Sequence, residues 1–325
     1  MPAASTPPPR PVGAESAPSA PRAGASRLVW VKVAITLALM AFLSTKLDLA
    51  GLDDKLQSAS VSLIVLAIII VSAEVPIVAL RWRLIARRTG SEMSLKLALQ
   101  LTWAGLFFGQ VLPASIGGDV VRGVLAARNG LTWQTVVSSL VVDRLIALLA
   151  AVVLIAASLP FLQADADAAL RLTAMISMIA VLALPVGLFV DRLPLPDSLR
   201  RHPLVSQGLH LMARMRQALF SRAGFMAMAL SLLVHAMTIV AVVALANSLG
   251  FSDVWVACAI VTPIALVAAA VPISVNGWGV REGVMVAGFA LFGIAQPDAF
   301  LVSVFLGLAV VVSALPGGWS WLILR

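Results

Sequence analysis

Cysteine, histidine and charged residues are all scarce in this 325-residue sequence. The single cysteine, Cys258, excludes an intrachain disulfide and a multi-cysteine metal site. The three histidines show no metal-ligand spacing, and no P-loop, Ser/His/Asp arrangement or nucleotide motif is present. The longest polar loop, 191–222, is too short for a catalytic domain. The sequence therefore predicts a protein that is not an enzyme and that needs no cofactor or metal.

Charge is low throughout and hydrophobicity is high. Only 12% of the residues are charged, 61% are hydrophobic and the mean hydropathy is +1.02. Soluble domains are about one-quarter charged. The net charge of +8 does not indicate a nucleic-acid partner, because the basic residues stand in short runs beside apolar segments, as topology signals do. The composition predicts an all-α polytopic membrane protein.

Apolar runs mark the segments that cross the membrane. Residues 1–27 are rich in Pro, Ala and Ser, which predicts a disordered cytoplasmic tail, and the transmembrane domain is expected over 28–325. A spanning helix needs about 20 apolar residues. Six full spans are predicted, at about 28–45, 60–80, 135–160, 170–190, 224–249 and 299–324. Two further apolar stretches, near 95–112 and 254–271, end in proline and glycine.

Basic residues occupy alternate loops and so orient the chain. The tail, the RWRLIARR run after the second span and the loop 191–222 are predicted to be cytoplasmic, as is the C-terminus, in a cell inner membrane. This alternation requires an even number of crossings in 95–130 and again in 254–295. A re-entrant broken hairpin at each place is the simplest solution, and a pair of full spans is the alternative. Irregular backbone in a membrane lines a cavity or is buried in protein, so the breaks indicate a site.

The two breaks share a motif. PASIGGDVVRG begins at Pro113 and PISVNGWGVRE at Pro272, and they match without a gap at Pro, Ser, Gly, Val and Arg, with an offset of 272 − 113 = 159 residues. The same offset carries the second span onto the fifth and the third onto the last. Repeat 1 (about 60–160) and repeat 2 (about 219–325) would then run in opposite directions, as inverted repeats do in many secondary transporters. Chance similarity among small residues is the alternative.

Each break begins a half-helix whose free N–H groups attract anions. Arg122 and Arg281 lie one turn further on, and a guanidinium suits phosphate or carboxylate. The predicted substrate site consists of these two arginines together with Ser115, Gly117, Gly118, Arg144, Ser274, Asn276 and Gly277. Asn276 replaces a glycine of the first motif and tolerates a left-handed backbone. Trp278, inside the second break, is a candidate gate, a packing plug or an interface anchor.

Four carboxylates lie in apolar surroundings, where charge is costly and typical of function. We expect them to exchange ion pairs or to bind a coupling proton; they are Glu74, Asp119, Asp143 and Glu282. Asp119 is three residues before Arg122, so the two can pair on one helical face. Glu282 directly follows Arg281 and cannot share its face, so it is expected to accept from the opposite half-helix or to accept a proton instead.

For several polar residues a structural role competes with a functional one. Glu74 either acts in the site or pairs with an arginine that holds helices together. Arg144 either snorkels to the cytoplasmic face or lines the cavity. Arg81 and Arg83 either anchor their helix at the membrane interface or dock a lipid headgroup. His235 is either a satisfied interior side chain or part of a proton relay.

The chain resembles the flippase-like membrane family, the transmembrane region of lysylphosphatidylglycerol synthases and of many stand-alone proteins. The resemblance covers about 28–325 and is carried by LRWRLIAR, PASIGGDVVRGVLAARNG, VVDRLIALL and PISVNGWGVREGVMVAGFALFG. Its most specific elements are Gly-Gly-Asp-x-x-Arg and Gly-x-Arg-Glu. The chain departs from the family at Asp143, where glutamate is usual.

The resemblance implies movement of a lipid or lipid-linked headgroup between leaflets. Substrates proposed within the family include aminoacylated phosphatidylglycerol, polyprenyl-linked sugars and hopanoid-related lipids. Lipid aminoacylation is not expected, because the synthase's soluble transfer domain is not in this sequence. The leading hypothesis is a flippase for an anionic phospholipid or polyprenyl-linked lipid. The alternatives are an accessory subunit that presents lipid to a glycosyltransferase or lipid synthase, and a secondary transporter of a small soluble anion.

Overall fold

The structure is a computed structural model of the chain. It describes residues 31, 33–42, 52–111, 117–158, 161, 172, 175–176, 178–179, 182–192, 196, 202–271 and 273–324. Within these residues every regular element is a helix, which confirms the predicted all-α class. The predicted tail, 1–27, lies outside them.

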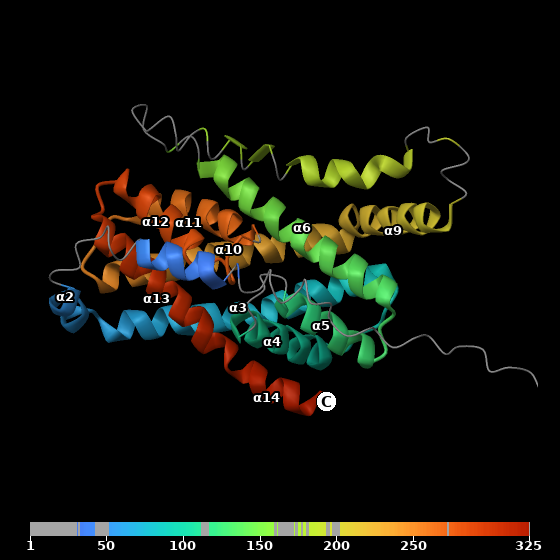
Figure 1. Ribbon diagram of the computed structural model, residues 1–325, viewed down its shortest axis with the longest axis horizontal. Helices are drawn as coiled ribbons and strands as arrows, with labels where there is room; N and C mark the ends of the chain where they lie inside the picture. Colours follow the sequence, from blue (N-terminus) through green and yellow to red (C-terminus); the bar gives the residue numbers. More distant parts are fainter. Residues whose placement is uncertain are drawn as a thin grey trace, which may run out of the picture.

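Four long apolar stretches form the body of the molecule (Figure 1). They are α3 (Val61–Thr89), α6 (Trp133–Ser158), α10 (Arg222–Ser248) and the consecutive pair α13 (Gln296–Ala314) and α14 (Pro316–Ile323). Each stretch is long and apolar enough to cross a membrane. They confirm four of the six predicted spans and make this a multi-pass membrane protein.

Two pairs of shorter helices lie between the long ones. In the first pair α4 (Leu95–Val111) packs against α5 (Gly117–Arg128), and in the second α11 (Trp255–Ala270) packs against α12 (Val280–Ala290). The interruption between α11 and α12 falls where proline and glycine predicted it. The residues of the first break, 112–116, lie outside the described part of the chain.

The remaining described elements are short. They are an apolar helix at Val33–Phe42, α2 (Leu52–Ser58), the 3-10 helix η2 (Leu184–Arg192) and α9 (Pro203–Leu219) in the predicted polar loop. The predicted spans at 28–45 and 170–190 are described only in part, the first as the helix Val33–Phe42 and the second mainly as η2, so neither is confirmed as a full span.

The helix α3 continues well beyond the predicted end of its span at residue 80. It ends at Gly90, whose left-handed backbone (φ 110°) lets its N–H donate to the Ala86 carbonyl. The extension carries the arginines that the sequence suggested as the membrane boundary. They continue the helix because Arg81 has partners inside the protein, as described below.

The last predicted span is interrupted rather than continuous. Pro316 cannot donate a backbone hydrogen bond and stands at the first position of α14. The next residue, Gly317, brings α14 close to α4, since a Cβ there would lie 2.0 Å from the Trp103 carbonyl oxygen. The C-terminal helix is therefore fixed against the first hairpin.

Candidate functional site

A cavity of about 290 Å³ lies among the long helices, and we call it the polar cavity. Side chains of α3, α4, α5, α6, α10 and α13 line it, together with Asn276 from the second break. Glu74, Asp143 and His235 are lining residues near the middle of α3, α6 and α10. The polar cavity therefore lies about halfway along the helices that are long enough to cross a membrane.

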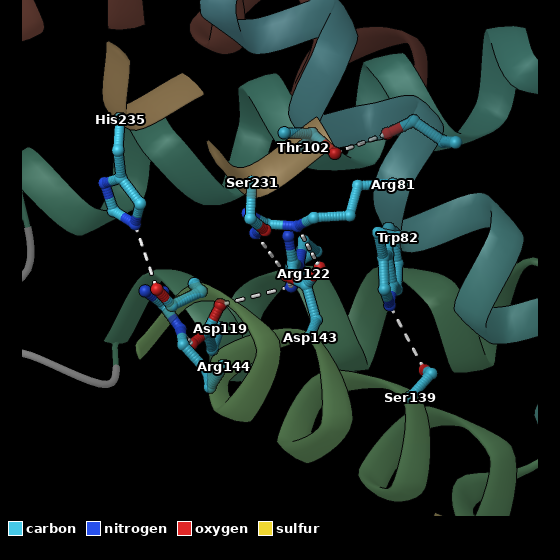
Figure 2. A network of polar contacts seen from close by, with 12 residues as sticks. Arg81, Trp82, Thr102, Asp119, Arg122, Ser139, Asp143, Arg144, Ser231 and His235 are labelled. Carbon is cyan, nitrogen blue, oxygen red and sulfur yellow. Dashed lines mark hydrogen bonds and ion pairs between the residues drawn. The ribbon is translucent and has the colours of Figure 1, made fainter. Parts of the chain in front are cut away.

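Five charged side chains at the polar cavity form a continuous ion-pair chain (Figure 2). The Asp143 carboxylate accepts from Arg81 Nε at 2.7 Å and Nη2 at 3.1 Å, and from Arg122 Nη2 at 3.2 Å. Arg122 Nη2 also lies 3.5 Å from Asp119 Oδ1, and Arg144 Nε donates to Asp119 Oδ2 at 2.6 Å. The order is Arg81–Asp143–Arg122–Asp119–Arg144. The signs alternate, which leaves the chain with one excess positive charge.

Burial changes along the ion-pair chain. Arg81, Arg122 and Asp143 are buried, whereas 61% of the Arg144 side chain is exposed. Charges removed from water need close partners to offset their desolvation. Asp143 serves two arginines, and Arg81 gains a further partner because its Nη1 donates to the Ser231 hydroxyl at 2.9 Å. The buried end is thus fixed in place, and Arg144 is the accessible end.

Trp82 positions the Arg122 guanidinium. The Arg122 Cζ lies 4.3 Å from the centre of the Trp82 ring, and Trp82 Nε1 donates to the Ser139 hydroxyl at 3.1 Å. Cation–π contact and packing hold the guanidinium against this buried ring. Arg122 Nε is buried and has no hydrogen-bond partner among the described residues. A buried unpaired donor is costly, so this N–H would be stabilised by a ligand oxygen that reached it.

Two lining residues from α3 and α10 add hydrogen-bond acceptors. Glu74 Oε1 accepts from the Thr238 hydroxyl at 2.9 Å, and no Lys, Arg or His of the described residues forms an ion pair with Glu74. His235 Nε2 lies 2.9 Å from the Ala147 carbonyl oxygen, which can only accept. The neutral ring therefore keeps its proton on Nε2, and Nδ1, which has no partner among the described residues, is left as an acceptor.

Arg281 lies in a second cluster, between α12 and α13. Its Nε donates to Glu282 Oε1 at 3.1 Å and to the Ser303 hydroxyl at 3.2 Å, and its Cζ lies 4.9 Å from the Trp278 ring centre. Arg281 is not among the residues that line the polar cavity. The expectation that Arg122 and Arg281 face one pocket is therefore not met, because Glu282 neutralises Arg281 within the second hairpin.

Glu282 has a local structural role as well. Its Oε2 accepts from the Gly279 N–H at 2.5 Å, which caps the start of α12. The expectation that Glu282 turns away from Arg281 is wrong, because the carboxylate bends back to the helix start and the long Arg281 side chain reaches it there. The positive end of α12 is satisfied by the chain's own carboxylate.

The second break has the backbone expected of it. Asn276 and Gly277 both have left-handed φ angles, 47° and 77°, which confirms the prediction for Asn276. The N–H of Val275 donates to the Thr36 hydroxyl at 2.8 Å, so the helix Val33–Phe42 lies against this break. Asn276 is the residue through which the second break reaches the polar cavity.

The small residues of the breaks serve close packing. Gly117 and Gly118 are buried at the start of α5, and a Cβ on Gly118 would lie 2.3 Å from the Gly105 carbonyl oxygen of α4. Gly118 also lines the polar cavity. Ser274 is fully buried in the second break. Ser115 lies outside the described residues.

The proposed headgroup-docking arginines differ in position. Arg81 was a candidate for docking a headgroup at the surface. It is instead buried and bound to Asp143. Trp82, between the two arginines, is fully buried. Arg83 is half-buried, and its Nε donates to the Met93 carbonyl at 2.9 Å. The α3 extension is thus held inside the helix bundle.

Sequence reasoning missed the polar stripe of α10. Ser231 binds Arg81, His235 binds the Ala147 carbonyl and Thr238 binds Glu74. These residues are spaced i, i+4 and i+7, which places them on one face of a helix. That spacing of polar residues in an otherwise apolar span was the available signal.

The comparisons with known proteins agree with this architecture. Residues 29–317 match the family model described as Lysylphosphatidylglycerol synthase TM region. The chain belongs to this family. No curated protein and no solved structure matches it. Membership of this family, together with the membrane-length helices, indicates a membrane protein involved in lipid handling.

Proposed function

We propose that this family member is a lipid flippase, which moves the headgroup of an anionic phospholipid or a polyprenyl-linked lipid between leaflets. The observation that carries the proposal is the polar cavity halfway along membrane-length helices. Charge at that depth is costly in a bilayer and marks substrate or ion pathways. The family description names a phosphatidylglycerol lipid, so a glycerophospholipid is the first substrate to test.

In this proposal the arginines of the cavity bind the headgroup phosphate. Arg122 offers its unpaired Nε–H, and Arg144 is exposed with Asp119 as its ion-pair partner. An incoming phosphate competes with Asp119 for these arginines, because a guanidinium can bind two oxygens of a phosphate as it can of a carboxylate. Ion pairs are then exchanged as the headgroup enters and leaves. Glu74 supplies the remaining carboxylate, for a cationic group or a coupling proton.

We further propose that two inverted repeats form the transport unit. Helix contacts that correspond under the 159-residue offset support this. The contact of α3 with α13 has its counterpart in α10 with α6, and the contact of α6 with α11 has its counterpart in α13 with α4. The first helices of the two repeats, α3 and α10, pack against each other extensively, which is compatible with a two-fold axis that passes between them.

Short helices support re-entrant hairpins over pairs of full spans. The hairpin helices α4, α5, α11 and α12 have 17, 12, 16 and 11 residues. About 20 residues are needed to cross the hydrocarbon core. In the proposed topology six full spans and two hairpins lie in the cell inner membrane, with both termini cytoplasmic.

Reconstitution tests the proposal. Purified protein in liposomes is expected to move fluorescently labelled phosphatidylglycerol from the inner to the outer leaflet, where a membrane-impermeant quencher outside the liposomes removes its fluorescence. Arg122→Gln is expected to slow this transfer. Arg83→Gln is the matched control, because Arg83 lies on α3 but not among the cavity residues. Transfer no faster than in protein-free liposomes contradicts the proposal. That result would favour an accessory subunit or a soluble-anion transporter.

A further inference from the structure

An apolar groove of about 690 Å³ lies between α5, α6 and α11, and we call it the side groove. Its walls are mainly aliphatic, with Val124 from α5, Leu140 and Leu148 from α6, and Leu266 from α11. Apolar walls of this kind suit a hydrocarbon chain, which has no polar atoms to satisfy.

The side groove and the polar cavity adjoin. They share five lining residues: Asp119, Arg144, Ala147, His235 and Asn276. The Arg144–Asp119 ion pair (Figure 2) therefore lies at the boundary between charged and apolar surroundings. A space that is polar at one end and apolar along the rest has the chemistry of a lipid, with its headgroup and its chain.

The side groove also opens sideways. Val120, Val137 and Val141 line it and are 57%, 42% and 40% exposed, whereas Val267 on its inner wall is buried. Trp133, at the start of α6, lines it as well and is 56% exposed. Val137 and Val141 lie on the membrane-length helix α6, where exposed valines face lipid, so the groove is accessible from the bilayer.

We infer that the side groove holds an acyl chain of the glycerophospholipid whose headgroup occupies the polar cavity. The inference rests on the proposed function and adds the route of the chain. The lipid enters sideways between α5, α6 and α11, and its headgroup passes the Arg144–Asp119 pair while the chain stays among aliphatic side chains. The chain exchanges bilayer lipid for side chains of similar polarity, so the transfer needs little free energy.

Photocrosslinking locates the chain. The full-length protein is placed in phosphatidylglycerol liposomes that contain phosphatidylglycerol with a diazirine in one acyl chain, irradiated and mapped by mass spectrometry. Adducts are expected to be several-fold denser on Val120, Val137 and Val141 than on Leu233 and Leu308. Those two leucines are 47% and 49% exposed and lie outside the groove, on α10 and α13. Equal adduct density on both sets overturns the inference.

A bulky substitution tests whether the groove is used. Val137→Trp fills the groove and is expected to remove the groove adducts and slow lipid transfer several-fold. Val153→Trp is the matched control, because Val153 lies on the same helix, is 47% exposed and is not a groove residue. Thermal unfolding of both variants checks that they fold. Folded variants with equal adducts and equal transfer rates contradict the inference.

The outcomes separate the groove from the flippase activity. Groove adducts without lipid transfer by the wild-type protein refute the flippase and leave the chain site standing. Lipid transfer with evenly spread adducts refutes the chain site and leaves the flippase standing. A polyprenyl phosphate with the same diazirine is the second arm, and groove adducts from this probe alone overturn the assignment to an acyl chain.

Discussion

Asp143 on α6 binds Arg81 on α3 through two hydrogen bonds, at 2.7 Å from Nε and 3.1 Å from Nη2, and both side chains are buried. The same carboxylate accepts from Arg122 on α5. One side chain thus joins two membrane-length helices to the second half of the first hairpin. The position of the polar cavity depends on this connection.

Replacing Asp143 with alanine is expected to destabilise the protein strongly. Two buried arginines would lose their shared carboxylate, and breaking a buried pair in this way costs about 3–5 kcal/mol. Arg144→Ala is the control at the next residue, where 61% of the side chain is exposed and the cost is at most about 1 kcal/mol. Chemical unfolding in detergent micelles measures both. Equal losses would contradict a structural role specific to Asp143.

Gly118→Ala is expected to force α4 and α5 apart. The added Cβ would lie 2.3 Å from the Gly105 carbonyl oxygen, and overpacking of this kind costs about 1–3 kcal/mol. Gly283→Ala is the matched helical control, because no described residue beyond its own helix turn has an atom within 4 Å of the added Cβ, and alanine there is expected to stabilise α12 by up to about 1 kcal/mol. Thermal unfolding reports the sign of each change. A Gly118→Ala protein as stable as wild type would refute the close helix contact.

Glu74→Gln is expected to separate activity from stability. Glutamine still accepts from the Thr238 hydroxyl, and removing a half-buried charge that has no ion-pair partner among the described residues should not lower the free energy of unfolding. Lipid transfer is expected to fall about tenfold, the equivalent of one charge-assisted hydrogen bond. Glu92→Gln, an exposed glutamate outside the polar cavity, is the control. Unchanged transfer in Glu74→Gln would exclude Glu74 from the transport site.

The second cluster is expected to be dispensable for binding the headgroup. The double variant Arg281→Met with Glu282→Gln removes both charges together, and glutamine can still cap α12. The folded double variant is expected to transfer lipid as fast as the wild-type protein does, whereas Arg122→Gln is expected to be slower. Transfer assays on equal amounts of monodisperse protein make the comparison. Loss of transfer in the folded double variant would return Arg281 to the substrate site.

Helices and breaks could be predicted from sequence because apolar runs, proline and glycine act locally. Charge partners could not, because they depend on how helices pack. The sequence indicated that the membrane boundary lies at Arg81. Asp143, 62 residues away, stabilises Arg81 inside the bundle, and α3 continues to Thr89. Glu282 was expected to avoid Arg281 because neighbours on a helix diverge. That rule fails in the first turn, where a side chain can fold back to the free N–H groups.

The ion-pair chain also limits how this protein can evolve. Asp143 and Asp119 each hold two arginines and share Arg122, so the loss of Asp143 leaves Arg81 without a carboxylate and the loss of Asp119 leaves Arg144 without one. A viable lineage must therefore alter an acid together with the arginine that depends on it, on two different helices. Relatives that lack an arginine at the position of Arg81 are expected to have a neutral residue at the position of Asp143. Alternatively, they are expected to have a new cation at another position close enough to pair with that acid. Correlated substitutions at these positions would be detectable in a sequence alignment of the family, even among members with different substrates.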